Sequence, residues 1–200
     1  MSLATTVYAL SLIVVAIVAY FLYASFAFGA GYQPTPARVV RRMLELAEIG
    51  PNETLYDLGA GTGAIVFAAA RKYGARVVGV EVEPLRVLIL RLRLWWGGPR
   101  DRVIFEWGNI FETDLHSAHI VAVFLWPGAM ARLQPILEKQ LPDGARVVSH
   151  WHKVPGWTPE VVDPELRVYL YRWPAAPSRV PAAKGESAAK VSLRPQERPG

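Results

Sequence analysis

The chain has 200 residues, of which 52% are hydrophobic and 20% are charged. This length and composition fit one folded domain with little room for a second, and they exclude a disordered polyampholyte. The sequence contains no cysteine, which excludes disulfide frameworks, thiolate zinc sites and cysteine nucleophiles.

The net charge of +5 is distributed unevenly along the chain. Residues 1–37 carry no charged side chain, residues 38–173 carry 17 basic and 15 acidic ones, and residues 174–200 carry 5 basic and 2 acidic ones. The basic character therefore owes more to the C-terminal tail than to a basic face on a folded body, so we expect no nucleic-acid partner.

The N-terminal segment has the character of a membrane helix. Residues 7–28 form an uncharged, mostly apolar stretch, and as a helix of ~33 Å it can cross a hydrocarbon core of ~30 Å. No basic residue precedes it, whereas Arg38, Arg41 and Arg42 follow it, which predicts a single-pass membrane protein whose folded part faces the cytoplasm. We favour this retained anchor, residues 1–31, over a cleaved signal peptide, because the stretch is long and lacks a basic n-region, and over a buried core helix, because every face is apolar.

The rest of the chain divides into a domain, residues 32–173, and a tail, residues 174–200. The tail is rich in Pro, Ala and Ser with scattered charge, which predicts a disordered basic tail. Strand and helix patterns alternate through the domain, which predicts an α/β fold with a doubly wound, mostly parallel seven-strand sheet that ends in an antiparallel pair. The expected strands are 54–58, 75–82, 102–107, 119–125, 145–150, 160–162 and 165–173. The expected helices are one capped by Thr35 and ended by Gly50-Pro51, and those at 62–73, 84–95 and 128–140.

The strongest chemical signal lies at the first strand-to-helix turn. An acid, Asp57, ends the strand, and Gly59, Gly61 and Gly63 follow at alternating positions. Glycines permit positive φ and let a ligand touch the backbone. Glu81, at the end of the second strand, can accept hydrogen bonds from the two hydroxyls of a ribose. The pattern predicts a nucleoside-containing ligand at the carboxyl ends of the strands.

Three explanations fit this turn: a dinucleotide site, an S-adenosylmethionine site, and a tight turn that binds no ligand. Gly59, Gly61 and Ala64 also satisfy the fingerprint of dinucleotide sites, and the glycines alone could form a tight turn without a ligand. S-adenosylmethionine is favoured because its sulfonium and amino groups attract a carboxylate such as Asp57, whereas a pyrophosphate does not. The domain is also short for two mononucleotide halves and a substrate domain.

The domain resembles the class I, seven-strand S-adenosylmethionine-dependent methyltransferases, which have a Rossmann-like fold. Residues 57–63 match the first motif of that family, and Glu81 matches its second-strand acid. The family often has Gly-Asp-x-Phe, whose acid contacts the adenine, where this chain has Gly108-Asn109-Ile110-Phe111. Asn109 departs from that acid but keeps an oxygen that can accept from an amino group. The resemblance implies these cofactor-binding residues: Asp57, Gly59, Gly61, Gly63, Glu81, Asn109 and Ile110.

A narrower resemblance connects the chain with a small group of protein lysine methyltransferases. Besides the glycine motif, it rests on the segments Tyr32-Gln33-Pro34-Thr35-Pro36, Phe124-Leu125-Trp126-Pro127 and Pro155-Gly156-Trp157-x-Pro159. The group includes broad-specificity archaeal enzymes and membrane-anchored mitochondrial enzymes that modify the ATP synthase c-subunit or the adenine nucleotide carrier. The resemblance implies protein lysine as the acceptor, and an N-terminal membrane helix fits the anchored members.

Methyl transfer from a sulfonium is an in-line displacement that needs alignment and exclusion of water rather than a nucleophilic side chain or a metal. Leu125, Trp126 and Pro127 follow the fourth strand, beside the expected methyl position, and are the candidate catalytic residues. Trp126 could wall a lysine channel through its ring face, and a core tryptophan is an equal alternative. Tyr32 and Thr35 are expected to fold over the cofactor, although a plain linker and helix cap explains Thr35 somewhat better.

Other features leave alternatives open. His150 and His152 lie two residues apart at the end of the fifth strand, but no third ligand is in view, so we expect no metal site and assign neither a catalytic role. Residues 85–96 carry three arginines among leucines and tryptophans, and a core helix is favoured there over one resting on a membrane. The predicted function is a membrane-anchored methyltransferase of protein lysine. The alternatives are a small lipophilic or lipid acceptor, and a non-catalytic, membrane-tethered adaptor.

Overall fold

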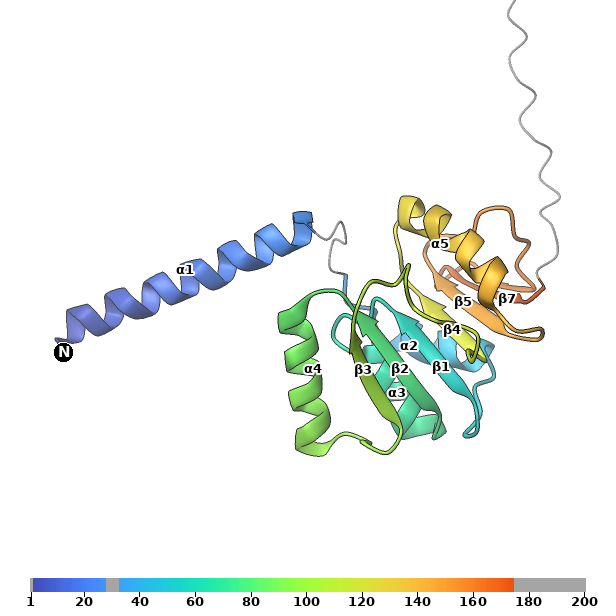
Figure 1. Cartoon of the computed structure of the whole chain (residues 1–200), viewed down its shortest axis with the longest axis horizontal. Helices are drawn as coiled ribbons and strands as arrows, with labels where there is room; N and C mark the ends of the chain where they lie inside the picture. Colours follow the sequence, from blue (N-terminus) through green and yellow to red (C-terminus); the bar gives the residue numbers. More distant parts are fainter. Residues whose placement is uncertain (1, 28–32, 175–200) are drawn as a thin grey trace, which may run out of the picture.

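The computed structural model describes residues 2–27 and 33–174 (Figure 1). Tyr32 and the predicted tail beyond Pro174 lie outside these residues, so the expectations for them remain predictions.

The core of the domain is one sheet with the strand order β3-β2-β1-β4-β5-β7-β6. Strands β1 to β5 run parallel, and β7 pairs antiparallel with both β5 and β6. The strands are β1 (Thr54–Leu58), β2 (Arg76–Glu81), β3 (Val103–Trp107), β4 (Ile120–Val123), β5 (Arg146–His150), β6 (Val161–Asp163) and β7 (Val168–Arg172). The predicted seven-strand, mostly parallel sheet with an antiparallel terminal pair is therefore confirmed. The strand order reverses between β1 and β4, which is where doubly wound folds bind ligands.

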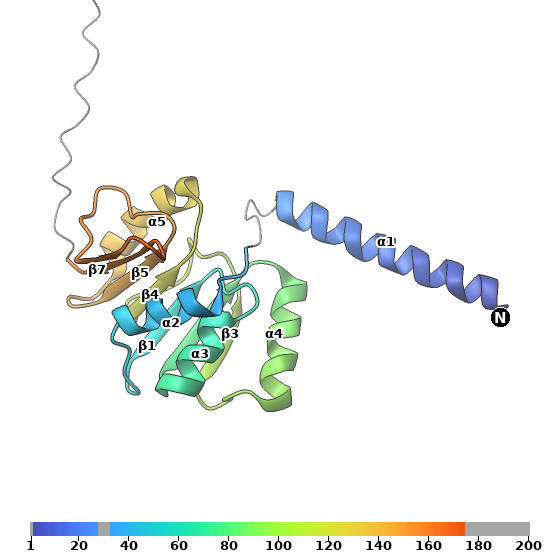
Figure 2. The same ribbon diagram turned by 180° about the vertical axis from the view of Figure 1, so that it is seen from behind.

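Helices cover both faces of this sheet. Figure 1 and Figure 2 show α2 (Ala37–Leu46) and α3 (Ala64–Tyr73) on one face and α5 (Pro127–Gln140) on the other, while α4 (Pro84–Gly97) stands along the β3 edge. Each face has its own apolar core, with Met43 and Val66 fully buried on one side and Leu133 on the other. Strand β4 is buried along its whole length, which explains its continuous apolar sequence.

Two helices begin differently from the prediction, and the backbone conformation at their N-terminal ends explains both differences. The expected cap at Thr35 is wrong: Pro36 is the N-cap of α2, and no side chain caps that end. Pro36 holds an extended conformation and accepts the N–H groups of Val39 and Val40 through its carbonyl. Helix α3 begins at Ala64 rather than at residue 62, because the residue before it, Gly63, has a left-handed φ of 76° that a right-handed helix cannot include.

The N-terminal helix α1 runs from Leu3 to Ala27, and apolar side chains such as Val7, Ile13 and Val15 are exposed on it. The Tyr20 hydroxyl donates a hydrogen bond to the Glu83 carboxylate at the start of α4. Within residues 2–27 and 33–174, no helix combines the length and apolar character that crossing a bilayer requires.

Candidate active site

The three glycines after β1 have different surroundings. Gly59, Gly61 and Gly63 all have positive φ, at 93°, 55° and 76°, a region that side chains with a Cβ rarely occupy. A Cβ on Gly63 would lie 2.7 Å from a Leu90 methyl, so Gly63 allows α3 and α4 to pack closely. A Cβ on Gly59 would meet only Leu125, at 3.7 Å, so the backbone there is open to a ligand.

Asp57 lies at the carboxyl end of β1, almost fully buried, and lines a cavity beside the glycine turn. Burial, and to a smaller extent the nearby Glu81 charge, together raise the pKa of Asp57 to about 7. Within the described part of the chain, no side chain or backbone donor hydrogen-bonds to the Asp57 carboxylate. A buried acid in this state attracts a cationic ligand, because a positive charge stabilises the carboxylate form. The cavity is lined by Gln33, Pro34, Thr35, Asp57, Gly59, Ala60, Gly61, Thr62, Ala64, Ile65 and Phe124.

Glu81 ends β2 as predicted and is almost fully buried. One carboxylate oxygen accepts the Gly61 N–H at 2.8 Å, and the other accepts the Glu83 N–H at 3.0 Å. The Arg86 guanidinium lies 3.5 Å from the second oxygen and forms a salt bridge with Glu81. A carboxylate has about four acceptor positions, so Glu81 fixes the turn and retains acceptor positions for a ribose, although it does not line the cavity beside the turn.

The loop after β3 begins next to Glu81, because the Gly108 N–H donates to the Glu81 carbonyl at 3.1 Å. In this loop the Asn109 side chain accepts the Phe111 N–H and donates to Glu112, so the amide stabilises the local turn. Ile110 beside it is half-buried. The Asn109 oxygen retains one lone pair, which leaves it able to accept a hydrogen bond from an adenine amino group.

A second cavity of about 100 Å³ adjoins the first, and Gln33 and Phe124 line both. Its walls are Gln33, Phe124, Leu125, Trp126, Trp151 and His152. Trp126 is 52% exposed, so the alternative of a core tryptophan is wrong. Leu125 lines this cavity as well, whereas Pro127 starts α5 and does not line it. The predicted acceptor side of the site thus includes two of its three candidate residues.

Trp151 is a wall residue that the sequence reading missed. It follows β5 with φ of 69°, a left-handed conformation that costs a residue with a Cβ about 1–3 kcal/mol. The conformation is held by Arg167, whose carbonyl accepts the Trp151 N–H at 2.8 Å and whose guanidinium lies 4.2 Å from the ring centroid. The signal that could have found it is its place directly after β5, at the same sheet edge as Asp57 and Trp126.

The two histidines of this strand end have different surroundings. His150 is buried, its Nδ1 atom has no partner within residues 2–27 and 33–174, and burial lowers its pKa. His152 lines the second cavity, with its ring centroid 5.9 Å from that of Trp126. Among the described residues, no three His, Asp or Glu side chains gather as a metal site would need.

These residues fit S-adenosylmethionine better than a dinucleotide. The ligand-facing group of the first cavity is a buried carboxylate, which attracts an ammonium or sulfonium and repels a pyrophosphate. Thr35 lines this cavity and Gly63 does not; that Thr35 folds over the cofactor stays a prediction.

Comparison with known proteins points to one family. The model of the ANTKMT methyltransferase domain matches residues 57–161. A protein-lysine N-methyltransferase of Saccharolobus islandicus is 40% identical over 147 residues, which cover 70% of this chain and 91% of that enzyme. The adenine nucleotide translocase lysine N-methyltransferase of Mus musculus is 35% identical over 142 residues, but the match spans only 62% of its length.

A solved structure shares the fold and much of the sequence. The RNA methyltransferase of Salinibacter ruber, solved with S-adenosyl-L-homocysteine, superposes with a TM-score of 0.66 at 43% identity. The match covers 76% of this chain and 98% of that one.

Proposed function

We propose that this chain, which belongs to the ANTKMT methyltransferase domain family and is an S-adenosylmethionine-dependent methyltransferase, transfers methyl groups to lysine side chains of proteins. The observation that carries the proposal is the aromatic second cavity, which meets the cofactor cavity at Gln33 and Phe124. A cavity with tryptophans in its walls fits a long, flexible amine. Two curated relatives named as lysine methyltransferases support the same acceptor.

S-adenosylmethionine supplies an electrophilic methyl group. On the protein side, the Asp57 carboxylate balances positive charge in the first cavity, and Glu81 holds the glycine turn while offering its free acceptor positions to ribose. The open backbone at Gly59 lets the cofactor lie close to the chain.

The second cavity has to position a lysine and favour its neutral form. Trp126 and Trp151 present ring surfaces on which lysine methylenes can pack, and the rings also stabilise a methylated ammonium. Apolar walls lower the pKa of a lysine ammonium by desolvation, which frees its lone pair for attack. Gln33, at the junction of the two cavities, offers an amide oxygen that can orient the amine.

Further parts of the proposal concern the membrane. We infer that residues 7–28 anchor the chain as a single pass and that the catalytic domain faces the cytoplasm. The support is the uncharged stretch, the arginines at 38, 41 and 42 that follow it, and the exposed apolar side chains of α1. Retention of the full chain in carbonate-washed membranes tests the anchor. External protease that removes the tail from intact cells would overturn the orientation.

RNA is the second candidate acceptor, because the solved relative at 43% identity is named as an RNA methyltransferase. The small charge excess of residues 38–173, with 17 basic and 15 acidic side chains, argues against a strong phosphate-binding face. A lipid or small lipophilic acceptor remains an alternative that an anchor would suit equally.

One labelling experiment separates these acceptors. The full chain is incubated with methyl-labelled S-adenosylmethionine and native membranes, and protein, RNA and lipid fractions are then counted separately. We expect label in protein, located on lysine by mass spectrometry. Label confined to RNA or lipid would overturn the lysine assignment, and the Asp57→Asn variant serves as the control with weakened cofactor binding.

A further inference from the structure

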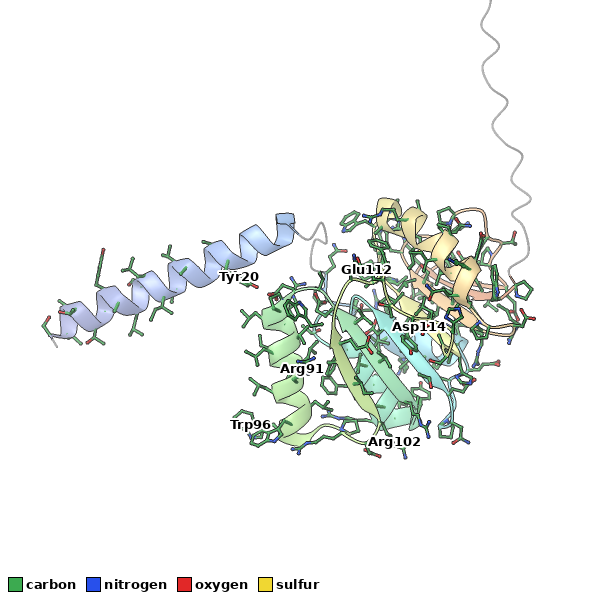
Figure 3. The ribbon with its side chains drawn as sticks, in the orientation of Figure 1. Tyr20, Arg91, Trp96, Arg102, Glu112 and Asp114 are labelled. Atoms are coloured by element: carbon green, nitrogen blue, oxygen red, sulfur yellow. The ribbon has the colours of Figure 1, made fainter. Side chains whose placement is uncertain are left out.

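Helix α4 is apolar on two opposite sides. One side packs toward the sheet and buries Val87 and Leu90. The other side carries large apolar side chains that are between 43% and 82% exposed: Leu88, Ile89, Leu92, Trp95 and Trp96. We call these five residues the outer stripe. Figure 3 shows Trp96 on the far end of α4 from α1, pointing away from the sheet. The sequence-based preference for an ordinary core helix therefore describes only half of its surface.

The outer stripe is continuous and has a defined width. At about 100° per residue, its five side chains fall within an arc of roughly 120° on the side opposite Val87 and Leu90. Scattered single apolar residues are normal on a surface, but a contiguous apolar stripe of this kind marks an interaction site.

Arginines lie along both edges of the outer stripe. Arg91 borders one edge and donates to the Phe105 carbonyl at 3.0 Å. Arg93 borders the other and donates to the Thr62 carbonyl at 2.6 Å. Arg100 lies 5.7 Å from the Trp95 ring centroid at the C-terminal end. Helix α4 contains no acidic residue, so a surface that meets the stripe has to be apolar in the middle and anionic at the sides.

The stripe also begins where α1 approaches the domain. Tyr20 of α1 donates to Glu83, the N-cap of α4. An apolar groove of about 550 Å³ lies between the two helices, lined by Ile13, Ala16, Tyr20, Pro84, Leu85 and Leu88. Leu88 belongs to both the groove and the outer stripe, so the apolar surface continues from one helix to the other.

We propose that the outer stripe of α4 is a membrane-contact surface that lies in the headgroup region of an anionic bilayer. Trp95 and Trp96 supply the amphipathic rings that settle at the interface, and the flanking arginines, held by the Phe105 and Thr62 carbonyls, place positive charge beside the lipid phosphates. A second copy of the chain fits less well, because a two-fold contact would bring basic edges against basic edges. The inference rests in part on the proposed anchor: insertion of residues 7–28 would release α4 from Ile13, Ala16 and Tyr20 and hold it at the surface of the same bilayer.

The absence of cysteine from the sequence makes a direct test practical. Leu92→Cys on the outer stripe and Asp143→Cys, at an exposed turn before β5, are each labelled with the same environment-sensitive fluorophore in the full chain. The variants are placed in nanodiscs of phosphatidylcholine and phosphatidylglycerol at 7:3. We expect lipid-attached quenchers to act at least threefold more strongly on the label at position 92 than on that at position 143.

The outcomes separate this proposal from the proposed anchor. If the chain joins the nanodiscs but aqueous iodide quenches the label at position 92 as strongly as the label at position 143, the surface proposal alone is overturned. A chain that does not join the nanodiscs overturns both. Equal shielding of position 92 in a detergent-solubilised dimer without lipid would assign the stripe to self-association and also overturn the proposal. Loss of the lipid quenching in Leu92→Cys when Trp96→Glu is added would support it.

Discussion

The Glu81 carboxylate accepts the Gly61 backbone N–H at 2.8 Å, so the end of β2 fixes the glycine turn that follows β1. Removing the carboxylate therefore affects both the turn and any ribose that it binds. We expect Glu81→Ala to weaken S-adenosylhomocysteine binding at least tenfold, because charge-assisted hydrogen bonds contribute ~1.5–3 kcal/mol each. Glu81→Gln keeps one acceptor oxygen and should lose less. Calorimetric titration measures both, and unchanged affinity in Glu81→Ala would make Glu81 purely structural.

Asp57 should couple cofactor binding to pH. Its pKa is raised from 3.8 to about 7, first by burial and then by Glu81, so the free folded chain binds more protons than the unfolded chain between those values. Stability of the free chain should therefore fall as pH rises through that window. A cationic cofactor favours the carboxylate, so affinity should rise from pH 6 to pH 8 with release of a proton.

The proton release at Asp57 can be measured directly. Calorimetry of S-adenosylmethionine binding at pH 6.5 in two buffers with different ionisation enthalpies reports the protons released. Asp57→Asn should abolish the difference between buffers and weaken binding. Proton release that persists in Asp57→Asn would assign the titration to another group.

His150 should limit stability in acid. Burial lowers its pKa, so the folded chain binds fewer protons than the unfolded chain below the ordinary value of 6.5. Stability contributed by the neutral ring is present above that value and is lost as pH falls below it. Thermal unfolding at pH 5 and pH 7.5 should show a smaller difference for His150→Gln than for the parent chain. An identical difference in both chains would remove His150 from the acid response.

The elements of the fold whose sequence signal lies in one contiguous stretch were predictable. Strand β1 has the bounds expected from its apolar run, and Asp57 with its glycines lies in the turn where an acid and positive φ are both needed. The acceptor cavity was only half predictable, because its walls come from three separate segments. Trp151 carries no local motif, and its left-handed backbone depends on Arg167, sixteen residues later in the chain. Only the parallel pairing of β4 with β5 brings Trp151 into the same cavity as Trp126.

Trp126 and Trp151 should act on the acceptor rather than on the cofactor, because both line the second cavity and neither lines the first. We expect either alanine variant to slow methyl transfer to lysine by one to two orders of magnitude, equivalent to ~1.4–2.7 kcal/mol of transition-state stabilisation. Trp151→Phe keeps a ring over which Arg167 can stack and should recover part of the rate. Val162→Ala, at an exposed apolar site on β6, is the matched control and should leave the rate unchanged. The measurements are single-turnover transfer and S-adenosylhomocysteine affinity. Parallel loss of both in Trp126→Ala or Trp151→Ala would show that the ring maintains the packing of the site and does not form an acceptor wall.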